Sequence, residues 1–302
     1  MSTHTYIQDT RNKNIKIYVN GEIIHRNEAK ISVFDSGFLL GDGVWEGIRL
    51  HHGQLVFEKE HFYRLYHGAK KLNIDIGITK RELKTIVYKV LEANNMATDI
   101  HIRLIISRGL KKTPYQHPSA NEGGATIVII PEYKKADISI NENGISLATV
   151  QTRRGTADTQ DPRLNTLSKL NCIFACIEAD KLGADEGLML DVNGYVSTCN
   201  STNFFIVKNE EVWTSTGEFC LPGITRNKII QLCKENNIPV YEKNFLLENV
   251  STANEAFVTG TFAGVIPVAS LNGKFISDGK RGEMTKTLFN LYKEKINFLY
   301  PQ

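Results

Sequence analysis

The stretch of sequence that decides the fold is GFLLGDGVWEGIR, residues 37–49. Its four glycines interrupt residues that favour β-strands, and glycine allows a backbone to bend tightly or to approach a ligand closely. Taken alone, such a run is more often a structural turn than a binding loop. The run therefore indicates a binding loop only in combination with other segments of the sequence.

Short apolar segments and turns precede this stretch, and longer periodic segments follow it. Asn20-Gly21 separates two strand-like segments, and this pair accepts the positive φ values of a type I′ hairpin turn. Apolar residues at helical spacing predict two helices, and two strands come after them. The predicted elements are a hairpin at 15–24, helices at 59–72 and 80–94, and strands at 100–107 and 125–131. Together they predict a smaller α+β domain over residues 1–131.

The polar stretch over residues 132–143 lacks apolar periodicity and is predicted to be an interdomain linker. The elements beyond it predict a larger α/β domain over residues 144–302. They are a strand at 145–151, a helix at 166–182, hairpins at 188–196 and 204–214, and helices at 226–236 and 282–295. The expected fold class is therefore α+β with two domains.

Composition limits the classes of function. The 302 residues carry a formal net charge of +3, which gives no electrostatic reason to expect a nucleic-acid partner. No apolar run is long enough to span a membrane, and the first residues lack the apolar core of a signal peptide. The five cysteines include no CxxC pair, so we expect reduced thiols and no metal site, with Cys172 and Cys176 as small packing residues on one helix face. We expect a cytoplasmic protein with a small-molecule ligand.

Two later segments have the character of anion sites. Leu221–Arg226 leads directly into a predicted helix, so free N–H groups and the positive end of the helix dipole lie beside Ile224 and Thr225. Thr259–Gly264 is a turn rich in hydroxyl groups and glycine, which can present N–H groups to an anion. Alone, each is more simply a helix cap or a turn.

In combination, five blocks of the sequence resemble the branched-chain and D-amino-acid aminotransferase group of fold type IV pyridoxal-phosphate enzymes. The blocks are residues 41–49, 61–65, 191–196, 221–226 and 259–267. They occur in the family's order and approximate spacing, and the resemblance covers nearly the whole chain. The resemblance implies a fold type IV, D-amino-acid aminotransferase-like architecture, pyridoxal 5′-phosphate as cofactor, and a homodimer. It also implies transfer of an amino group between an amino acid, branched-chain-like or D, and a 2-oxo acid.

The resemblance assigns a phosphate-binding role to four residues. Arg64 would grip the cofactor phosphate through a bidentate guanidinium contact, which lysine reproduces poorly. Ile224 and Thr225 would bring the helix N-terminus to the same phosphate. Thr261 would add a further contact.

Substrate binding is expected at one face of the strand over residues 100–107. Arg103 and Arg108 lie five positions apart and therefore face opposite sides of an extended chain. By resemblance either one is a candidate for the substrate carboxylate, Arg108 in the manner of D-amino-acid enzymes. Trp45 matches an aromatic residue that lines the substrate pocket.

One departure from the family concerns the lysine that forms a Schiff base with the cofactor. Counting back from Glu178-Ala179, the position of this lysine holds Asn165, which has no amine. We predict that Lys169, one helical turn along the same face, replaces it. Lys169 would then begin a row of small or polar side chains beside an apolar stripe, which we expect to keep the lysine partly out of water. The expected stripe is Leu170, Ile173, Phe174 and Ile177.

A second departure is Thr198, which stands where the family has a glutamate facing the pyridine nitrogen. A hydroxyl cannot hold this nitrogen protonated as a carboxylate does, so slow amino transfer is expected. Alternatively Glu186 or water serves the nitrogen and Thr198 only ends a strand. Two other functions stay open, a lyase similar to aminodeoxychorismate lyase and a non-catalytic cofactor-binding homologue.

Overall fold

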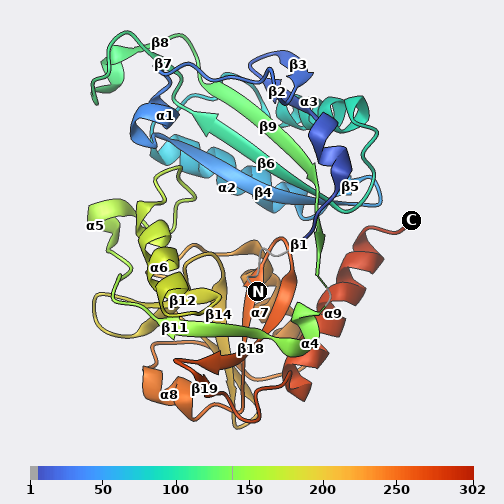
Figure 1. Ribbon diagram of the computed structural model, residues 1–302, viewed down its shortest axis with the longest axis vertical. Helices are drawn as coiled ribbons and strands as arrows, with labels where there is room; N and C mark the ends of the chain where they lie inside the picture. The colour runs from blue at the N-terminus through green and yellow to red at the C-terminus, as the bar shows by residue number, and fades with distance from the viewer. Residues whose placement is uncertain (1–5, 138) are drawn as a thin grey trace. The chain divides into compact units, whose positions relative to one another are not determined.

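The computed structural model describes residues 6–137 and 139–302 (Figure 1). The chain forms two compact units. The N-terminal unit comprises Ile7–Lys135 and Leu164–Lys169, and the C-terminal unit comprises mainly Ala136–Arg163 and Leu170–Pro301. The short strands β1 (Tyr6–Ile7) and β10 (Lys135–Ala136) pair with each other.

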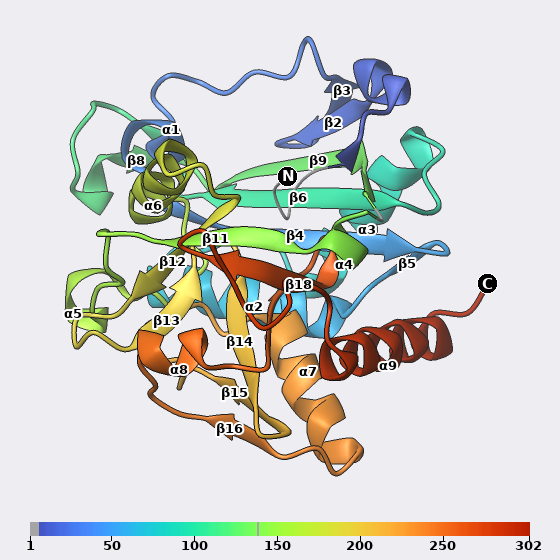
Figure 2. The same ribbon diagram turned by 60° about the horizontal axis from the view of Figure 1, so that its bottom comes forward.

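The N-terminal unit is built on a six-stranded antiparallel sheet of order β3-β2-β9-β6-β4-β5. Figure 2 shows β2, β9, β6 and β4 side by side. The strands are β2 (Lys16–Val19), β3 (Glu22–His25), β4 (Gly43–His51), β5 (Gln54–Leu55), β6 (Ile100–Ser107) and β9 (Thr126–Tyr133). The helices are α1 (Ser36–Leu40), α2 (Glu58–Lys71) and α3 (Lys80–Ala93), with 3-10 turns at Thr10–Asn14 and Pro118–Ala120, and β7 (Leu110–Lys111) pairs with β8 (Asn121–Glu122). The predicted hairpin, helices and strands of this region are confirmed.

Local sequence explains why α3 forms where it does. Thr79 and Glu82 make a capping box, in which each side chain pairs with the other's backbone N–H. The helix then buries Leu83, Val87 and Val90 completely in the core of the unit. Burial of these side chains, at roughly 1.5–3 kcal/mol each, contributes more stability than the cap.

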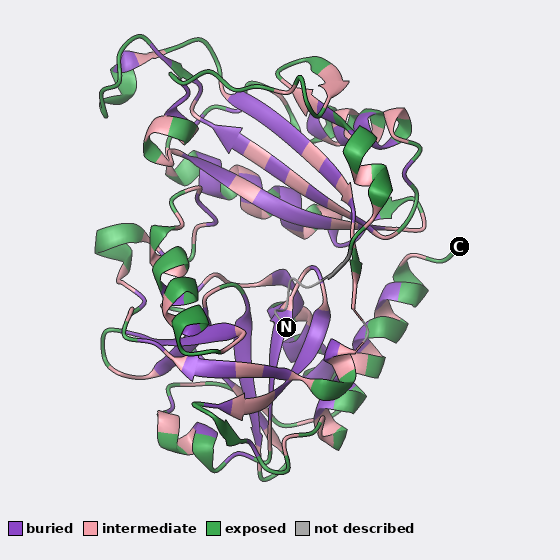
Figure 3. Cartoon of the chain, viewed as in Figure 1, coloured by how far each residue is buried: buried purple, intermediate pink, exposed green. Residues whose placement is uncertain are grey.

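The two faces of the N-terminal sheet differ. Side chains alternate along a strand, and β4 and β6 accordingly change between buried and intermediate segments (Figure 3). Ile102, Leu104 and Ile106 on one face are fully buried. The opposite face carries Trp45 and Arg103, which are only partly buried. This second face is called the open face below.

Residues 164–169 are not helical but extend the N-terminal sheet along β4. The N–H of Trp45 donates to the carbonyl of Asn165 at 3.0 Å, and that of Leu167 donates to the carbonyl of Gly43 at 2.9 Å. A Cβ atom at Gly43 would lie 2.3 Å from the carbonyl oxygen of Ile106, so the close packing here requires glycine. The predicted helix start at 166 is therefore wrong, because pairing with β4 overrides local helix propensity. Asn165 and Lys169 both precede α6, so they do not share a helix face as predicted.

The C-terminal unit contains a nine-stranded mixed sheet of order β13-β12-β11-β18-β17-β14-β15-β16, with β19 on β18. The strands are β11 (Ile145–Thr149), β12 (Glu186–Leu190), β13 (Val196–Cys199), β14 (Asn203–Lys208), β15 (Glu211–Thr214), β16 (Val240–Glu242), β17 (Glu255–Gly260), β18 (Gly264–Leu271) and β19 (Lys274–Phe275). The helices are α4 (Ile140–Asn143), α5 (Ala157–Gln160), α6 (Leu170–Lys181), α7 (Ile224–Glu235), α8 (Leu247–Ser251) and α9 (Glu283–Leu299). Both predicted hairpins, β12–β13 and β14–β15, are confirmed. Part of the stretch predicted as a linker forms α4, whose Ile140 is buried.

Helix α6 buries the face opposite to the predicted one. Ala175 and Ala179 pack with Val150 and Met189 in a small core, and a Cβ atom at Gly187 of β12 would lie 2.8 Å from the carbonyl oxygen of Ala175. Small residues thus allow the helix to approach the strand closely. The predicted stripe is exposed instead, at 58% for Leu170, 50% for Ile173, 51% for Phe174 and 44% for Ile177. Cys176 is exposed as well, which contradicts its predicted packing role.

Candidate functional site

Trp45 on the open face is held by three hydrogen bonds from the segment that extends the sheet. Its N–H donates to the carbonyl of Asn165, and its indole Nε1 donates to the carbonyl of Thr166 at 3.1 Å. In return the side-chain amide of Asn165 donates from Nδ2 to the Trp45 carbonyl at 2.6 Å. The indole ring is therefore fixed in position.

Two cationic side chains lie against this ring. The guanidinium carbon of Arg103 is 3.7 Å from the ring centre, and Nζ of Lys169 is 5.5 Å from it. Gly47 pairs with Arg103 across the strands, and a Cβ atom at Gly47 would lie 2.9 Å from Nε2 of His101. Burial lowers the pKa of Arg103, and nearby Glu132 partly opposes this effect. Arginine still remains charged at neutral pH, so this cluster can bind a carboxylate.

Arg108, the other arginine predicted to bind substrate, follows the last residue of β6. Its guanidinium is hydrogen-bonded to other residues of the N-terminal unit. It donates to Asp42 from Nε at 2.6 Å and from Nη2 at 3.0 Å. It also donates to the carbonyls of Asn73 and Leu72, at 2.9 Å and 2.8 Å. These contacts occupy both sides of the guanidinium, so Arg103 is the better placed candidate for a carboxylate ligand.

Arg64 on α2 forms an ion pair on the core face of the sheet. Its guanidinium donates to both oxygens of Glu46, at 2.7 Å and 2.8 Å, and Nδ1 of His61 lies 2.7 Å from the same carboxylate. Burial alone raises the pKa of Glu46, but Arg64 and His61 outweigh it and the pKa lies below its ordinary value. The role of Arg64 as a phosphate ligand stays a prediction.

The ion pair of Glu46 predicts a pH-dependent stability. Because the folded pKa is depressed, the carboxylate stabilises the fold above the ordinary pKa of 4.5, and this contribution is lost as pH falls through the folded value. We expect Glu46→Gln to lower the free energy of unfolding by about 3 kcal/mol near neutral pH, since Arg64 loses its buried partner. Thermal unfolding from neutral to acidic pH tests this. A gap between variant and wild type that does not narrow below the ordinary pKa would contradict it.

In the C-terminal unit, α7 begins with an uncapped turn. Gly223 is the N-cap residue and makes no side-chain cap bond. Among the described residues the first helical N–H groups and the helix dipole are therefore available to an anion. Asn203 supports the turn by donating from Nδ2 to the carbonyl of Leu221 at 3.0 Å. Ile224 and Thr225 follow at once and are buried.

A buried hydroxyl lies on the sheet next to this helix start. Thr259 pairs with Asn203 across β14 and β17, so both side chains lie on the same face of the sheet. Thr259 is 2% exposed, and among the described residues its Oγ1 has no hydrogen-bond partner. Thr261 is in the turn that joins β17 to β18. An unpaired buried hydroxyl beside free helix N–H groups suits a phosphate.

The start of α7 depends on glycine at position 223. A Cβ atom there would lie 2.0 Å from Oδ1 of Asn203. We expect Gly223→Ala to lower the free energy of unfolding by about 1–3 kcal/mol, as overpacking does, and to weaken cofactor affinity. Thermal unfolding and cofactor titration measure these effects. Gly124→Ala is the matched control, because a Cβ atom at Gly124 meets nothing within 4 Å, and equal effects of both changes would contradict the prediction.

Thr198 on β13 has its hydroxyl proton engaged. Oγ1 donates to the carbonyl of Thr202 at 2.7 Å. Nearby Glu186 is buried and accepts from Ser201 and Thr202, each at 2.8 Å. The sequence did not lead us to predict that Ser201 and Thr202 donate to Glu186. The signal for it was the run of hydrogen-bonding side chains Asn200-Ser201-Thr202. In this orientation the Thr198 hydroxyl can accept a hydrogen bond from a ligand, but it cannot donate one, because its proton is bound to the Thr202 carbonyl.

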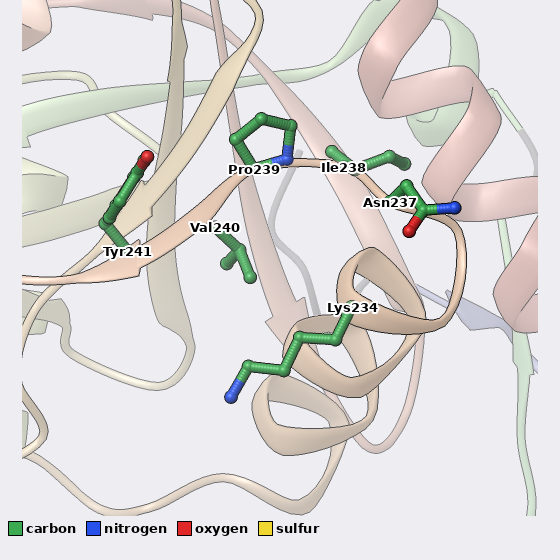
Figure 4. Close-up of a pocket in the computed structure, with 6 residues that line it drawn as sticks. All are labelled: Lys234, Asn237, Ile238, Pro239, Val240 and Tyr241. Carbon is green, nitrogen blue, oxygen red and sulfur yellow. The ribbon is translucent and has the colours of Figure 1, made fainter.

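A separate surface pocket of about 420 Å³ lies near the end of α7 (Figure 4). Its lining residues are Lys234, Asn237, Ile238, Pro239, Val240 and Tyr241. None of the predicted site residues contributes to it. Within the described part of the chain, no group of three or more His, Cys, Asp or Glu side chains is arranged to hold a metal ion, and no helix is long and apolar enough to cross a membrane.

Known proteins share both the sequence and the fold of this chain. Residues 43–271 match the family described as amino-transferase class IV. The chain is 39% identical over 94% of its length to branched-chain-amino-acid aminotransferase-like protein 1 of Arabidopsis thaliana, and spans about half (51%) of that protein. It is 39% identical to a putative branched-chain-amino-acid aminotransferase of Methanocaldococcus jannaschii, over 93% of this chain and 96% of that one.

A solved structure gives the same result for the fold. The branched-chain amino acid aminotransferase of Escherichia coli superposes with a TM-score of 0.86 at 29% identity, over 95% of this chain and 94% of that one. The mixed α/β architecture is that of the fold type IV enzymes. The family match covers well over half of the chain. The chain belongs to the class IV aminotransferase family.

Proposed function

We propose that this protein is a pyridoxal 5′-phosphate-dependent aminotransferase that moves an amino group between an amino acid and a 2-oxo acid. One observation carries the proposal. The guanidinium of Arg103 and the amine of Lys169 lie 3.7 Å and 5.5 Å from the centre of one indole ring, that of Trp45. A carboxylate-binding group and an amine are thus close together, as amino transfer to and from a 2-amino acid requires.

Each unit, taken by itself, carries residues whose chemistry suits one end of the cofactor. The uncapped start of α7, with Ile224 and Thr225, and the unpaired hydroxyl of Thr259 suit a phosphate, and Thr261 is a further candidate contact. Lys169 would bind the aldehyde carbon covalently. A solved branched-chain aminotransferase of similar fold carries pyridoxamine 5′-phosphate, which supports the choice of cofactor. When bound, the cofactor supplies an aldehyde that takes up the amino group and a ring that withdraws electrons from the substrate Cα.

Each residue of the open face has a task in this proposal. Arg103 binds the substrate carboxylate in the two-pronged geometry that guanidinium favours. Trp45, fixed by its hydrogen bonds to Asn165 and Thr166, excludes water from the reacting carbon. Lys169 would move the proton between the substrate Cα and the aldehyde carbon of the cofactor, in opposite directions in the two halves of the reaction.

The test is an assay of the full chain with pyridoxal 5′-phosphate, 2-oxoglutarate and a panel of branched-chain L-amino acids and D-alanine. The expected result is glutamate and a new 2-oxo acid in equal amounts. In a second assay with aminodeoxychorismate and no 2-oxo acid, formation of pyruvate would replace the proposal by the lyase. Cofactor binding without any product would replace it by the non-catalytic homologue.

A specific observation favours the non-catalytic homologue as the second candidate. Asn165, at the family's lysine position, is buried and hydrogen-bonded to Trp45, and Thr198, at the glutamate position, donates to a carbonyl. Both side chains are built into the surrounding structure. They provide neither an amine nor a carboxylate for the cofactor.

We also propose that the chain forms a homodimer. The exposed apolar residues of α6, including Leu170 and Phe174 at 58% and 51% exposure, form a patch that a second copy could cover. Light scattering of the wild type and of a Phe174→Ser variant measures the mass. A wild type that is monomeric at micromolar concentration would exclude the dimer.

A further inference from the structure

Asn165 carries a buried acceptor that nothing in the described chain satisfies. The residue is 5% exposed, and its Oδ1 has no hydrogen-bond partner there. The orientation of the amide is fixed, because the Trp45 carbonyl 2.6 Å away can only accept and must face Nδ2. The unsatisfied atom is therefore the oxygen.

A buried acceptor without a donor is unfavourable, and native proteins keep few of them. Leucine has the same number of side-chain heavy atoms and no polar oxygen, but it would leave the Trp45 carbonyl without its donor. Lysine would offer donors alone. The oxygen belongs to the side chain that clamps Trp45, whose ring contacts Arg103 and Lys169. A ligand that reaches this cluster can supply the missing donor.

We propose that Oδ1 of Asn165 accepts a hydrogen bond from an amine N–H of the bound ligand, so that the protein favours amine forms over carbonyl forms. A carbonyl oxygen has no proton to offer and would repel Oδ1. This inference rests on the proposed function for the identity of the ligand. Two ligands carry the required group, a 2-amino acid and the amine form of the cofactor.

Binding of matched probe pairs tests the proposal without any turnover. The first pair is pyridoxamine 5′-phosphate and 4-deoxypyridoxine 5′-phosphate, which lack the aldehyde and so cannot react with Lys169. The second pair is leucine and 4-methylpentanoate, which differ in the amino group. Calorimetric titration of the full chain gives the ratio of dissociation constants within each pair. We expect Asn165→Leu to reduce the preference for the amine probe about tenfold, as loss of one hydrogen bond to a charged group does.

Asn94→Leu is the matched control. Asn94 also clamps a strand backbone, but both its atoms are satisfied: Oδ1 accepts from Lys16 N–H at 2.6 Å and Nδ2 donates to the Lys16 carbonyl at 2.9 Å. Asn94→Leu should lower the free energy of unfolding without changing the ratio of dissociation constants in either probe pair.

A loss of preference in the first pair assigns the donor to the cofactor amine, and a loss in the second pair assigns it to the amino acid. If neither ratio changes in Asn165→Leu, or if the wild type binds no amine probe, the proposal is overturned. Absence of amino transfer with intact amine preference would instead remove the proposed function alone.

Discussion

Lys169→Ala is expected to abolish covalent attachment of the cofactor and to lower the rate of amino transfer by roughly a thousandfold. Proton transfer by a positioned side chain alone contributes roughly 10²–10⁴-fold, and the covalent bond is lost in addition. Nζ of Lys169 lies 5.5 Å from the centre of the Trp45 ring, which the Arg103 guanidinium also contacts. Borohydride reduction of the cofactor-loaded protein, followed by peptide mass mapping, measures the attachment, and the glutamate assay measures the rate.

Two control variants test whether the effect comes from the Lys169 amine itself. One keeps the positive charge at this position, and the other removes a different lysine that could react with the cofactor. Lys169→Arg keeps a cation near Trp45 but provides no nucleophilic amine, so it should behave as the alanine variant does. Lys134→Ala removes another partly buried lysine, whose pKa is lowered chiefly by burial, and should keep the label on Lys169. Label recovered from Lys134 in the wild type would take the role away from Lys169. Complete absence of label would favour the non-catalytic candidate.

The second large effect is expected from Asn165→Lys combined with Thr198→Glu. The pair supplies an amine at the family position and a carboxylate that holds the cofactor nitrogen protonated. We expect amino transfer to rise at least tenfold, roughly the effect of one pKa unit or 1.4 kcal/mol in the barrier. The covalent label should move from Lys169 to position 165. Unchanged rates and an unmoved label would show that neither position faces the cofactor.

The single change Thr198→Glu gives an independent readout of the same site. Thr198 is 6% exposed and lies near the buried Glu186 network, so a second carboxylate is costly unless a cation pairs with it. Without cofactor this variant should therefore melt well below the wild type. Addition of cofactor should raise its melting temperature more than that of the wild type, because the protonated nitrogen then balances the charge.

Most of the fold was predictable because its elements are locally encoded. The Asn20-Gly21 turn and the Thr79–Glu82 capping box each mark a boundary by their own chemistry. The start of helix α6 was not predictable, because it is set by pairing of residues 164–169 with β4. Its buried face is likewise set by Ala175 against Gly187, whereas periodicity indicates an apolar face without showing which surface it contacts.

For the candidate site, the sequence predicted which types of residue take part, but it did not show which of two equivalent residues is available to a ligand. Arg103 and Arg108 were equivalent in the sequence, and only contacts with Asp42, 66 positions away, show that Arg108 is already engaged. The unsatisfied atoms of Asn165 and Thr259 have no sequence signal at all. They arise from burial and register, which a single sequence does not contain.

The pairing of residues 164–169 with β4 also bears on synthesis of the protein. Before Leu167 leaves the ribosome, the N–H and C=O groups of β4 at Gly43 and Trp45 lack the partners that they have in the native fold. An unpaired strand edge is a template for association between chains. A nascent or truncated chain that ends near residue 135 should therefore aggregate more readily than one that ends after residue 169, and chaperone demand during translation should fall once this segment is available.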